Sequence, residues 1–249
     1  MQQSYRLDKI GLINRDKKIS FKFNGKKFFG YEGDTIASAL IANGVHLIGR
    51  SFKYHRPRGF FGAGVDEPYA IVQLYRNNET DPNVRATEQE LFEGLEATSV
   101  NCWPSVNFDI GAINNFLNRF FPAGFYYKTF MWPKSFWYKV YEPFIRKAAG
   151  LGKSPLKDDP DNYEHIHYHC DVLIIGGGLS GLFAAKLTAK SGLKVLLVDN
   201  QETLGGSLLA EKSDTFTIDD QLSHDWLHKI INNISNYTNL KIINSTTLF

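Results

Sequence analysis

The stretch CDVLIIGGGLSG, residues 170–181, decides the fold of the C-terminal part of the chain. Residues 170–175 form a continuous apolar run, which predicts a parallel strand buried on both faces. The run leads directly into Gly176, Gly178 and Gly181, which have the G-x-G-x-x-G spacing. In this motif the first glycine permits a tight turn, the second lets the backbone approach a pyrophosphate, and the third lets a helix pack on the strand. The stretch therefore predicts the phosphate-binding turn of a Rossmann-type fold.

The residues after the turn continue this pattern. We expect a helix over 182–191 and a second strand over 194–198, which ends in Asp199. An acid at this point accepts hydrogen bonds from a ribose 2′-hydroxyl. It would repel a 2′-phosphate, and the following Asn200 and Gln201 provide no arginine to compensate. The site is therefore expected to prefer NAD or FAD over NADP; the alternative is a glycine-rich turn with no ligand.

The rest of the C-terminal part holds fewer signals. The string LGGS at 204–207 is typical of flavoproteins with two dinucleotide folds, and a helical stretch over 225–234 precedes a third strand over 240–244. These elements predict a Rossmann-type FAD/NAD-binding domain over 166–249, incomplete at its C-terminus because such a domain normally has more strands.

The N-terminal part predicts a different fold. Residues 19–32 alternate around Asn24-Gly25, a type I′ turn signal, and form a predicted β-hairpin. Asp34 is the expected N-cap of a helix of about ten residues. A glycine-rich loop over 49–68 and a strand over 69–75 follow. Hairpin, helix, loop and strand in this order predict a β-grasp domain over 1–100.

The middle of the chain is the least regular. A helix is expected over 88–97, and closely spaced prolines follow. Aromatic residues crowd between Phe116 and Phe144, which predicts packing between domains or against a partner subunit. We therefore expect an aromatic-rich connecting region over 101–165, with residues 157–161 as its linker.

Composition excludes several classes of protein. The 28 basic and 26 acidic residues give a net charge of +2, which is too small to indicate nucleic-acid binding. The two cysteines, Cys102 and Cys170, cannot form a disulfide framework or a cluster site. Neither a signal peptide nor an apolar run long enough for a membrane span is present. A cytoplasmic protein without membrane or nucleic-acid partners is expected.

Several longer strings carry a resemblance. They are GRSFKYHRPRG at 49–59, NCWPS at 101–105, AGFYYKTFMWP at 123–133 and YEP at 141–143. Together with the glycine motif, they resemble the α subunit of heterotetrameric sarcosine oxidase, in its N-terminal portion. The resemblance covers nearly the whole chain.

The resemblance implies an activity for the assembled enzyme. Such an α subunit joins a β-grasp domain, an NAD-holding domain and a C-terminal tetrahydrofolate-binding domain, and it assembles with β, γ and δ subunits. The complex oxidises sarcosine to glycine with FAD on the β subunit. It passes electrons to FMN at the α/β contact, reduces oxygen to hydrogen peroxide and gives the one-carbon unit to tetrahydrofolate.

The resemblance also assigns cofactor-binding residues, and no catalytic residue or metal ligand. The phosphate turn is matched by Gly176, Gly178, Ser180 and Gly181, and the ribose acid by Asp199. Further NAD contacts are implied at Asn200, Gln201, Ser207 and Leu248. The family often has Glu-Arg after the acid, where this chain has Asn200-Gln201, so fewer charged contacts are expected there.

The β-grasp part resembles domains that carry a [2Fe–2S] cluster on four cysteines. No cysteine precedes Cys102, so we expect no iron–sulfur cluster and a docking or structural role. Two alternatives stay open. One is the α subunit of a related amine or opine dehydrogenase, or of a cyanide-forming amino-acid dehydrogenase; the other is a non-catalytic interaction module with a vestigial dinucleotide fold.

Two smaller clusters admit a functional and a structural interpretation. The basic loop containing Arg50, Lys53, Arg56 and Arg58 is expected to clamp a neighbouring domain or a cofactor phosphate. The alternating His165, His167 and His169 could share one face of a strand and bind zinc, but no further ligand is evident. We expect them to form an exposed lead-in to the first Rossmann strand.

Overall fold

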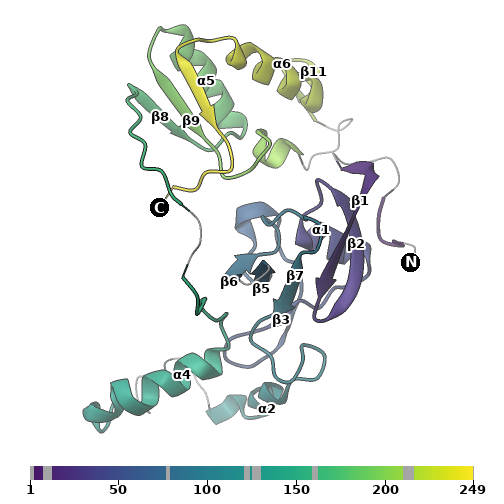
Figure 1. Ribbon diagram of the computed structural model, residues 1–249, viewed down its shortest axis with the longest axis vertical. Coiled ribbons are helices and arrows are strands. Elements are labelled where there is room, and N and C mark those ends of the chain that lie inside the picture. The colour runs from purple at the N-terminus through teal and green to yellow at the C-terminus, as the bar shows by residue number, and fades with distance from the viewer. Residues whose placement is uncertain are drawn as a thin grey trace. The chain divides into compact units, whose positions relative to one another are not determined.

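The computed structural model describes residues 3–7, 13–76, 79–120, 124, 130–158, 162–209 and 216–248. Its contacts divide the chain into two units, Met1–Pro160 and Asp161–Phe249 (Figure 1). The division falls within the expected linker at 157–161, and the described residues of 101–158 belong to the first unit. The chain has mixed α/β structure, as the sequence predicts.

The first unit is built on a five-stranded mixed sheet in the order β2-β1-β7-β5-β6. The strands β1 and β7 are parallel and the other neighbours are antiparallel. The hairpin turn is confirmed, because Asn24 and Gly25 have φ of 50° and 74°, the two positive values that a type I′ turn requires. The strands are β1 Asn14–Phe23, β2 Lys26–Glu32, β5 Ile71–Arg76, β6 Glu79–Arg85 and β7 Glu96–Ser99, with a small pair formed by β3 Gly49–Arg50 and β4 Pro57–Arg58.

Helix α1, Ile36–Ala42, contributes several buried side chains to the apolar core that it forms with the sheet. It is shorter than expected, and its N-cap is Thr35 rather than Asp34. The hydroxyl of Thr35 accepts from the N–H of Ser38 at 3.2 Å, which completes a capping box. The buried core residues are Ile19, Phe21, Phe23, Ile36, Ala37, Ala39, Leu40, Ile48, Ala70, Val72, Leu74, Ala86, Leu91, Leu95 and Ala97.

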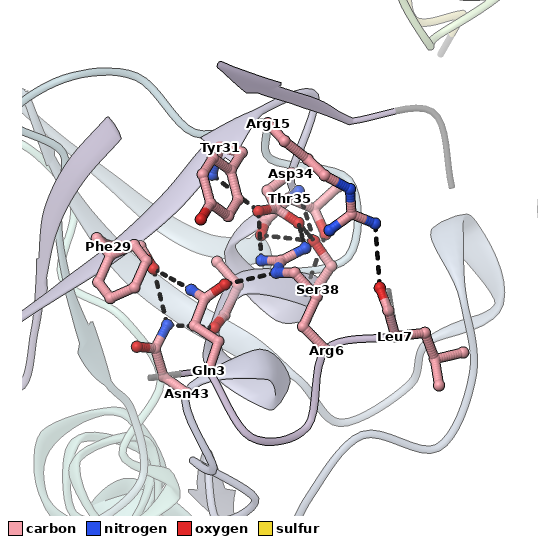
Figure 2. Close-up of polar contacts among 11 residues, drawn as sticks. Gln3, Arg6, Leu7, Arg15, Phe29, Tyr31, Asp34, Thr35, Ser38 and Asn43 are labelled. Atoms are coloured by element: carbon pink, nitrogen blue, oxygen red, sulfur yellow. Dashed lines mark hydrogen bonds and ion pairs between the residues drawn. The ribbon is translucent and has the colours of Figure 1, made fainter. Parts of the chain in front are cut away.

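Asp34 is used instead in a buried ion pair. Its carboxylate accepts two hydrogen bonds from the guanidinium of Arg6, at 3.1 and 2.6 Å, and its side chain is 1% exposed (Figure 2). The same carboxylate accepts from the N–H of Tyr31 and from the hydroxyl of Ser38. These bonds tie the N-terminal segment to the second strand and to the start of α1.

The prediction of a helix over residues 88–97 is wrong. Gly94 has φ of 81°, and its N–H donates to the carbonyl of Ser20, while Leu91 and Leu95 are buried in the core. Residues 88–95 form a loop that leads into β7, and residues 96–97 belong to that strand. The loop's backbone hydrogen bonds to distant segments replace those of a helix, so tertiary packing overrides local helix propensity.

Glu67 organises the loop that joins β4 to β5 and contains the short turn η1, Gly64–Asp66. Its carboxylate is 1% exposed and accepts four backbone N–H groups at 2.6–3.0 Å, from Phe61, Gly62, Tyr69 and Ala70. Burial opposes the ionised form and would raise the pKa of Glu67. The four N–H groups together stabilise the anion more strongly, so the pKa of Glu67 is lowered from the ordinary value of a glutamate.

The segment after β7 consists of short helices with exposed aromatic side chains. They are η2 Ile110–Ala112, α2 Ile113–Phe116, η3 Asn118–Phe120, η4 Lys134–Phe136, η5 Trp137–Tyr141 and α4 Glu142–Ala149. Phe116, Trp132 and Tyr138 are more than 80% exposed. Residues 121–123 and 125–129 of the aromatic stretch lie outside the described residues, so its expected packing stays a prediction.

The second unit is a three-stranded parallel sheet in the order β12-β9-β8, with two helices packed on it. Its elements are β8 Val172–Ile175, α5 Leu179–Lys190, β9 Val195–Val198, η6 Gly206–Leu209, β10 Thr217–Ile218, β11 Gln221–Leu222, α6 Ser223–Ser235 and β12 Leu240–Ile243. Right-handed crossovers in this strand order place both helices on one face. Helices α5 and α6 share a single apolar core with Ile174.

The sequence predicted a first strand buried on both faces, and this is wrong. Ile174 is 9% exposed, but Leu173 and Ile175 are 47% and 70% exposed. The side chains of a strand alternate, and α5 and α6 cover only the face that holds Ile174. In the part of the chain that the structure describes, no helix is both long and apolar enough to cross a membrane.

Removal of Arg6 is expected to destabilise the first unit. An Arg6→Ala variant leaves the buried carboxylate of Asp34 without its cation, which costs about 3 kcal/mol of unfolding free energy. Chemical denaturation of the variant measures this loss. The matched control is Lys17→Ala, because Lys17 pairs with Glu32 at the surface, where such a pair contributes less than about 1 kcal/mol. Equal losses in the two variants would contradict the role of the buried pair.

Glu67 is expected to make stability depend on pH. Its folded pKa is lowered, so its stabilising effect is present above the unfolded value and is lost as pH falls through the folded value. A Glu67→Gln variant should lose about 1–3 kcal/mol at neutral pH. This difference from the unmodified protein should shrink below about pH 4.5. Denaturation curves between pH 3 and 7 measure it. Glu96→Gln is the control, because Glu96 is a partly exposed acid that pairs with Lys22 at the surface. A difference that does not vary with pH would refute the assignment.

Candidate functional site

The glycine motif forms the turn between β8 and α5. Gly176 has φ of 94°, a conformation that favours glycine, and Gly178 is the N-cap residue of α5. No side chain caps this helix, so the N–H groups of its first turn are oriented toward the space before it. Such a helix start attracts anions, phosphate groups in particular.

The other two motif glycines have different surroundings. A Cβ atom on Gly181 would overlap the carbonyl oxygen of Gly176, so any side chain there would push the helix off the turn. A Cβ atom on Gly178 would meet nothing nearer than the Cα of Gly206 at 4.0 Å. Space for a ligand therefore remains at Gly178, whereas Gly181 is packed against the turn.

A second glycine pair lies against this turn. The N–H of Gly205 donates to the carbonyl of Gly177 at 2.9 Å, and a Cβ atom on Gly206 would be 3.0 Å from the Cα of Gly178. The string LGGS at 204–207 signalled this pair, but sequence reasoning did not include Gly205 or Gly206 in the site. Both walls of the cradle are therefore backbone, which lets a ligand approach closely.

Asp199 lies at the end of β9 and is 7% exposed. Its carboxylate accepts a short hydrogen bond from the N–H of Gly177 and a second, at 2.7 Å, from the N–H of Gln201. Sequence reasoning missed this bracing of the turn. A carboxylate has about four acceptor positions, so positions remain for ribose hydroxyl groups.

The remaining expected contacts lie around this centre. Ser180, in the first turn of α5, and Ser207, next to Gly206, are both exposed, as is Asn200. The carbonyl of Gln201 accepts from the N–H of Ser245, and that of Asp199 from the N–H of Thr246. Leu248 follows two residues later and is 47% exposed. The sequence analysis did not predict the contact of Thr246, because it is made by the backbone N–H and not by the side chain.

Cys102 does not have the environment of a nucleophile. Burial raises the pKa of its thiol, and the negative charge of Asp109 raises it further, against a smaller opposing effect of Arg50. The neutral thiol is therefore favoured at neutral pH. Within the described ranges, no group of three or more His, Cys, Asp or Glu side chains could hold a metal ion.

The two motif glycines should differ in their effect on stability. Gly181→Ala should lower the unfolding free energy of the second unit by about 1–3 kcal/mol, because the methyl group meets backbone that cannot move aside easily. Gly178→Ala, with its φ of −73° and free space, should change it by less than about 1 kcal/mol. Thermal denaturation of both variants measures this contrast, and a larger loss for Gly178→Ala would contradict the packing.

Comparison with known protein families supports the fold predicted for each unit. Residues 16–102 match the 2Fe-2S iron-sulfur cluster binding domain family, and residues 174–243 match the NAD(P)-binding Rossmann-like domain family. The crystal structure of L-proline dehydrogenase from P. horikoshii has a similar fold, with a TM-score of 0.51 at 19% sequence identity. The similar region covers 93% of this chain and 34% of the dehydrogenase chain. The predicted fold class is therefore confirmed.

Curated relatives match nearly the whole chain. Sarcosine oxidase subunit alpha of Rhizobium meliloti is 53% identical over 99% of this chain and 25% of its own length. The subunit of the same name from a Corynebacterium species is 28% identical over 95% of this chain and 20% of its own. The chain thus spans about a quarter or less of these relatives. Along nearly its entire length, it is a relative of the α subunits of sarcosine oxidase.

Proposed function

We propose that the second unit binds NAD at the turn between β8 and α5. The observation that carries the proposal is the cradle made by Gly178 and Gly206 beside an uncapped helix start. The N–H groups of this helix start would hold the pyrophosphate, and the carboxylate of Asp199 would accept from the adenosine ribose. When bound, NAD can supply hydride exchange; this chain's own residues bind and orient the nucleotide.

We infer that the site prefers NAD to NADP because Asp199 is buried and already holds the turn. A 2′-phosphate would bring two negative charges close together in a partly dry environment. Ser180, Asn200, Gln201, Ser207 and Leu248 would make further contacts along the nucleotide. FAD uses the same type of turn and is the competing ligand in the test below.

We further propose that the chain is part of the α subunit of a sarcosine-oxidising complex. The 53% identity to the Rhizobium meliloti subunit supports this proposal. In that role it would work in the cytoplasm with β, γ and δ subunits, and FAD and FMN would carry electrons from sarcosine to oxygen, which yields hydrogen peroxide. Tetrahydrofolate would receive the one-carbon unit on another part of the subunit.

The first unit would serve this complex without an iron–sulfur cluster. It matches a cluster-binding family, but the matched residues contain a single cysteine, Cys102, at their end. A [2Fe–2S] cluster requires four thiolate ligands or their equivalent. We therefore propose that this unit keeps the fold for docking or support, with the loop around Glu67 held by a carboxylate.

Nucleotide titration tests the binding proposal. The intact protein should bind NAD, and NADP should bind at least about tenfold more weakly, since its 2′-phosphate faces Asp199. Gly178→Ala should weaken NAD binding by about tenfold or more, because its methyl group occupies the cradle while the fold survives. Isothermal titration calorimetry with NAD, NADP and FAD gives these affinities, with Leu187→Ala, at an exposed position of α5 outside the cradle, as control.

Two results would contradict this assignment. Tighter binding of FAD than of NAD would assign the turn to the flavin, and absence of any nucleotide binding would favour a vestigial fold. Turnover of sarcosine by the complex, with hydrogen peroxide as product, tests the larger proposal separately. Turnover of another amine or amino acid with no activity on sarcosine would assign the chain to a related dehydrogenase.

A further inference from the structure

A pocket in the first unit is rich in basic side chains. It lies beside β3 and β4 and has a cavity volume of about 410 Å³, within the usual range of small-molecule sites. None of the residues that line it is acidic. Its basic side chains are Arg50, Lys53, Arg56 and Arg58, and its aromatic side chains are Phe52, Tyr54 and Tyr69.

The loop that bears these residues is already ordered by its own contacts. The guanidinium of Arg50 donates to the carbonyl of Val106 at 2.8 and 2.6 Å. His55 Nδ1 lies 2.7 Å from a carboxylate oxygen of Asp109, whose side chain is fully buried. Arg56 Nε donates to Asn115 at 2.7 Å. A ligand would therefore meet a formed loop, and its binding would cost little ordering entropy.

Two residues that line this pocket each have a buried polar atom with no hydrogen-bond partner in the described part of the chain. Arg58 Nε is buried without a hydrogen-bond acceptor among the described residues, although the guanidinium lies 4.7 Å from the ring centroid of Tyr69. Asn101 is 7% exposed, and its Oδ1 likewise has no described donor, while its Nδ2 donates to the carbonyl of Arg50. Unpaired buried polar groups are costly, and a ligand that reached Arg58 Nε or Asn101 Oδ1 from the pocket would remove that cost.

We propose that this pocket binds a small phosphate ester that also carries a hydroxyl group. The planar guanidinium of Arg58 would receive the phosphate, because its fork of N–H donors matches phosphate oxygens. The hydroxyl group would donate to Asn101 Oδ1. A phosphorylated ribose, as in a sugar phosphate or a mononucleotide, carries both a phosphate and hydroxyl groups, and the exposed rings of Phe52 and Tyr69 offer surfaces to a base.

This site is separate from the nucleotide turn of the second unit. Every residue that lines the pocket falls between Gly49 and Leu151, inside the first unit. A long polyanion such as nucleic acid is disfavoured by the net charge of only +2. The experiment must nevertheless exclude phosphate binding at the helix start of α5.

Calorimetric titration in the Gly178→Ala background tests the proposal. Inorganic phosphate, ribose 5-phosphate and AMP are the probes, at low ionic strength. Arg58→Met should weaken ribose 5-phosphate binding at least about tenfold, since a charge-assisted hydrogen bond is removed. The matched control is Arg85→Met, because Arg85 is a half-exposed arginine of the same unit that pairs with Glu88 outside the pocket, and it should change affinity less than about twofold.

A second variant keeps the test decisive if Arg58→Met fails to fold. Lys53→Met should weaken the same binding about threefold or more while the thermal transition is retained. Equal affinity in a folded Arg58→Met or Lys53→Met protein would overturn the proposal. The proposal would also be overturned if none of the three probes bound in a saturable way. It would be overturned as well if the protein bound a single-stranded oligonucleotide but neither ribose 5-phosphate nor AMP.

Discussion

Within each of the two units, buried carboxylates that accept backbone N–H groups hold neighbouring segments of the chain in place. Asp34, Glu67 and Asp199 are each less than 10% exposed, and each has at least two donors within hydrogen-bond distance. An isolated charge in such a place would be very costly. The donors of Glu67 and Asp199 lie in loops between elements, so satisfying each charge also fixes the loop. The donors of Asp34 lie in the N-terminal segment, in β2 and in α1, so this charge ties those three segments to one another.

In the second unit, this constraint joins structure and binding in one side chain. The carboxylate of Asp199 holds Gly177, the middle glycine of the turn, and in the proposed site it would also accept from a ribose. The geometry of the phosphate cradle and the choice of nucleotide therefore cannot vary independently. Replacement of Asp199 would disturb both, which is why Gly178, where a methyl group fits without strain, separates binding from folding more cleanly.

Local signals explain which features the sequence predicts well. Asn24-Gly25 and the glycine motif impose backbone conformations that few other residues adopt, so their turns follow from the residues themselves. The N-cap at Thr35 instead of Asp34 depends on Arg6, which is distant in sequence. The lost helix at 88–97 and the exposed face of β8 likewise depend on what packs nearby. Long-range packing and backbone-mediated contacts, such as those of Asp199 and Thr246, have no local signal.

The same pairing rule explains why the basic pocket of the first unit stays positive. Its acidic neighbours are already committed: Glu67 is saturated by four backbone N–H groups, and Asp109 is bound to His55 and to the N–H groups of Trp103 and Gly111. These acids cannot turn toward Arg58 without leaving buried donors unpaired. Near-neutral charge for the whole chain is therefore compatible with a basic local site, since these two acids are buried and bonded elsewhere and the residues that line the pocket include no acid.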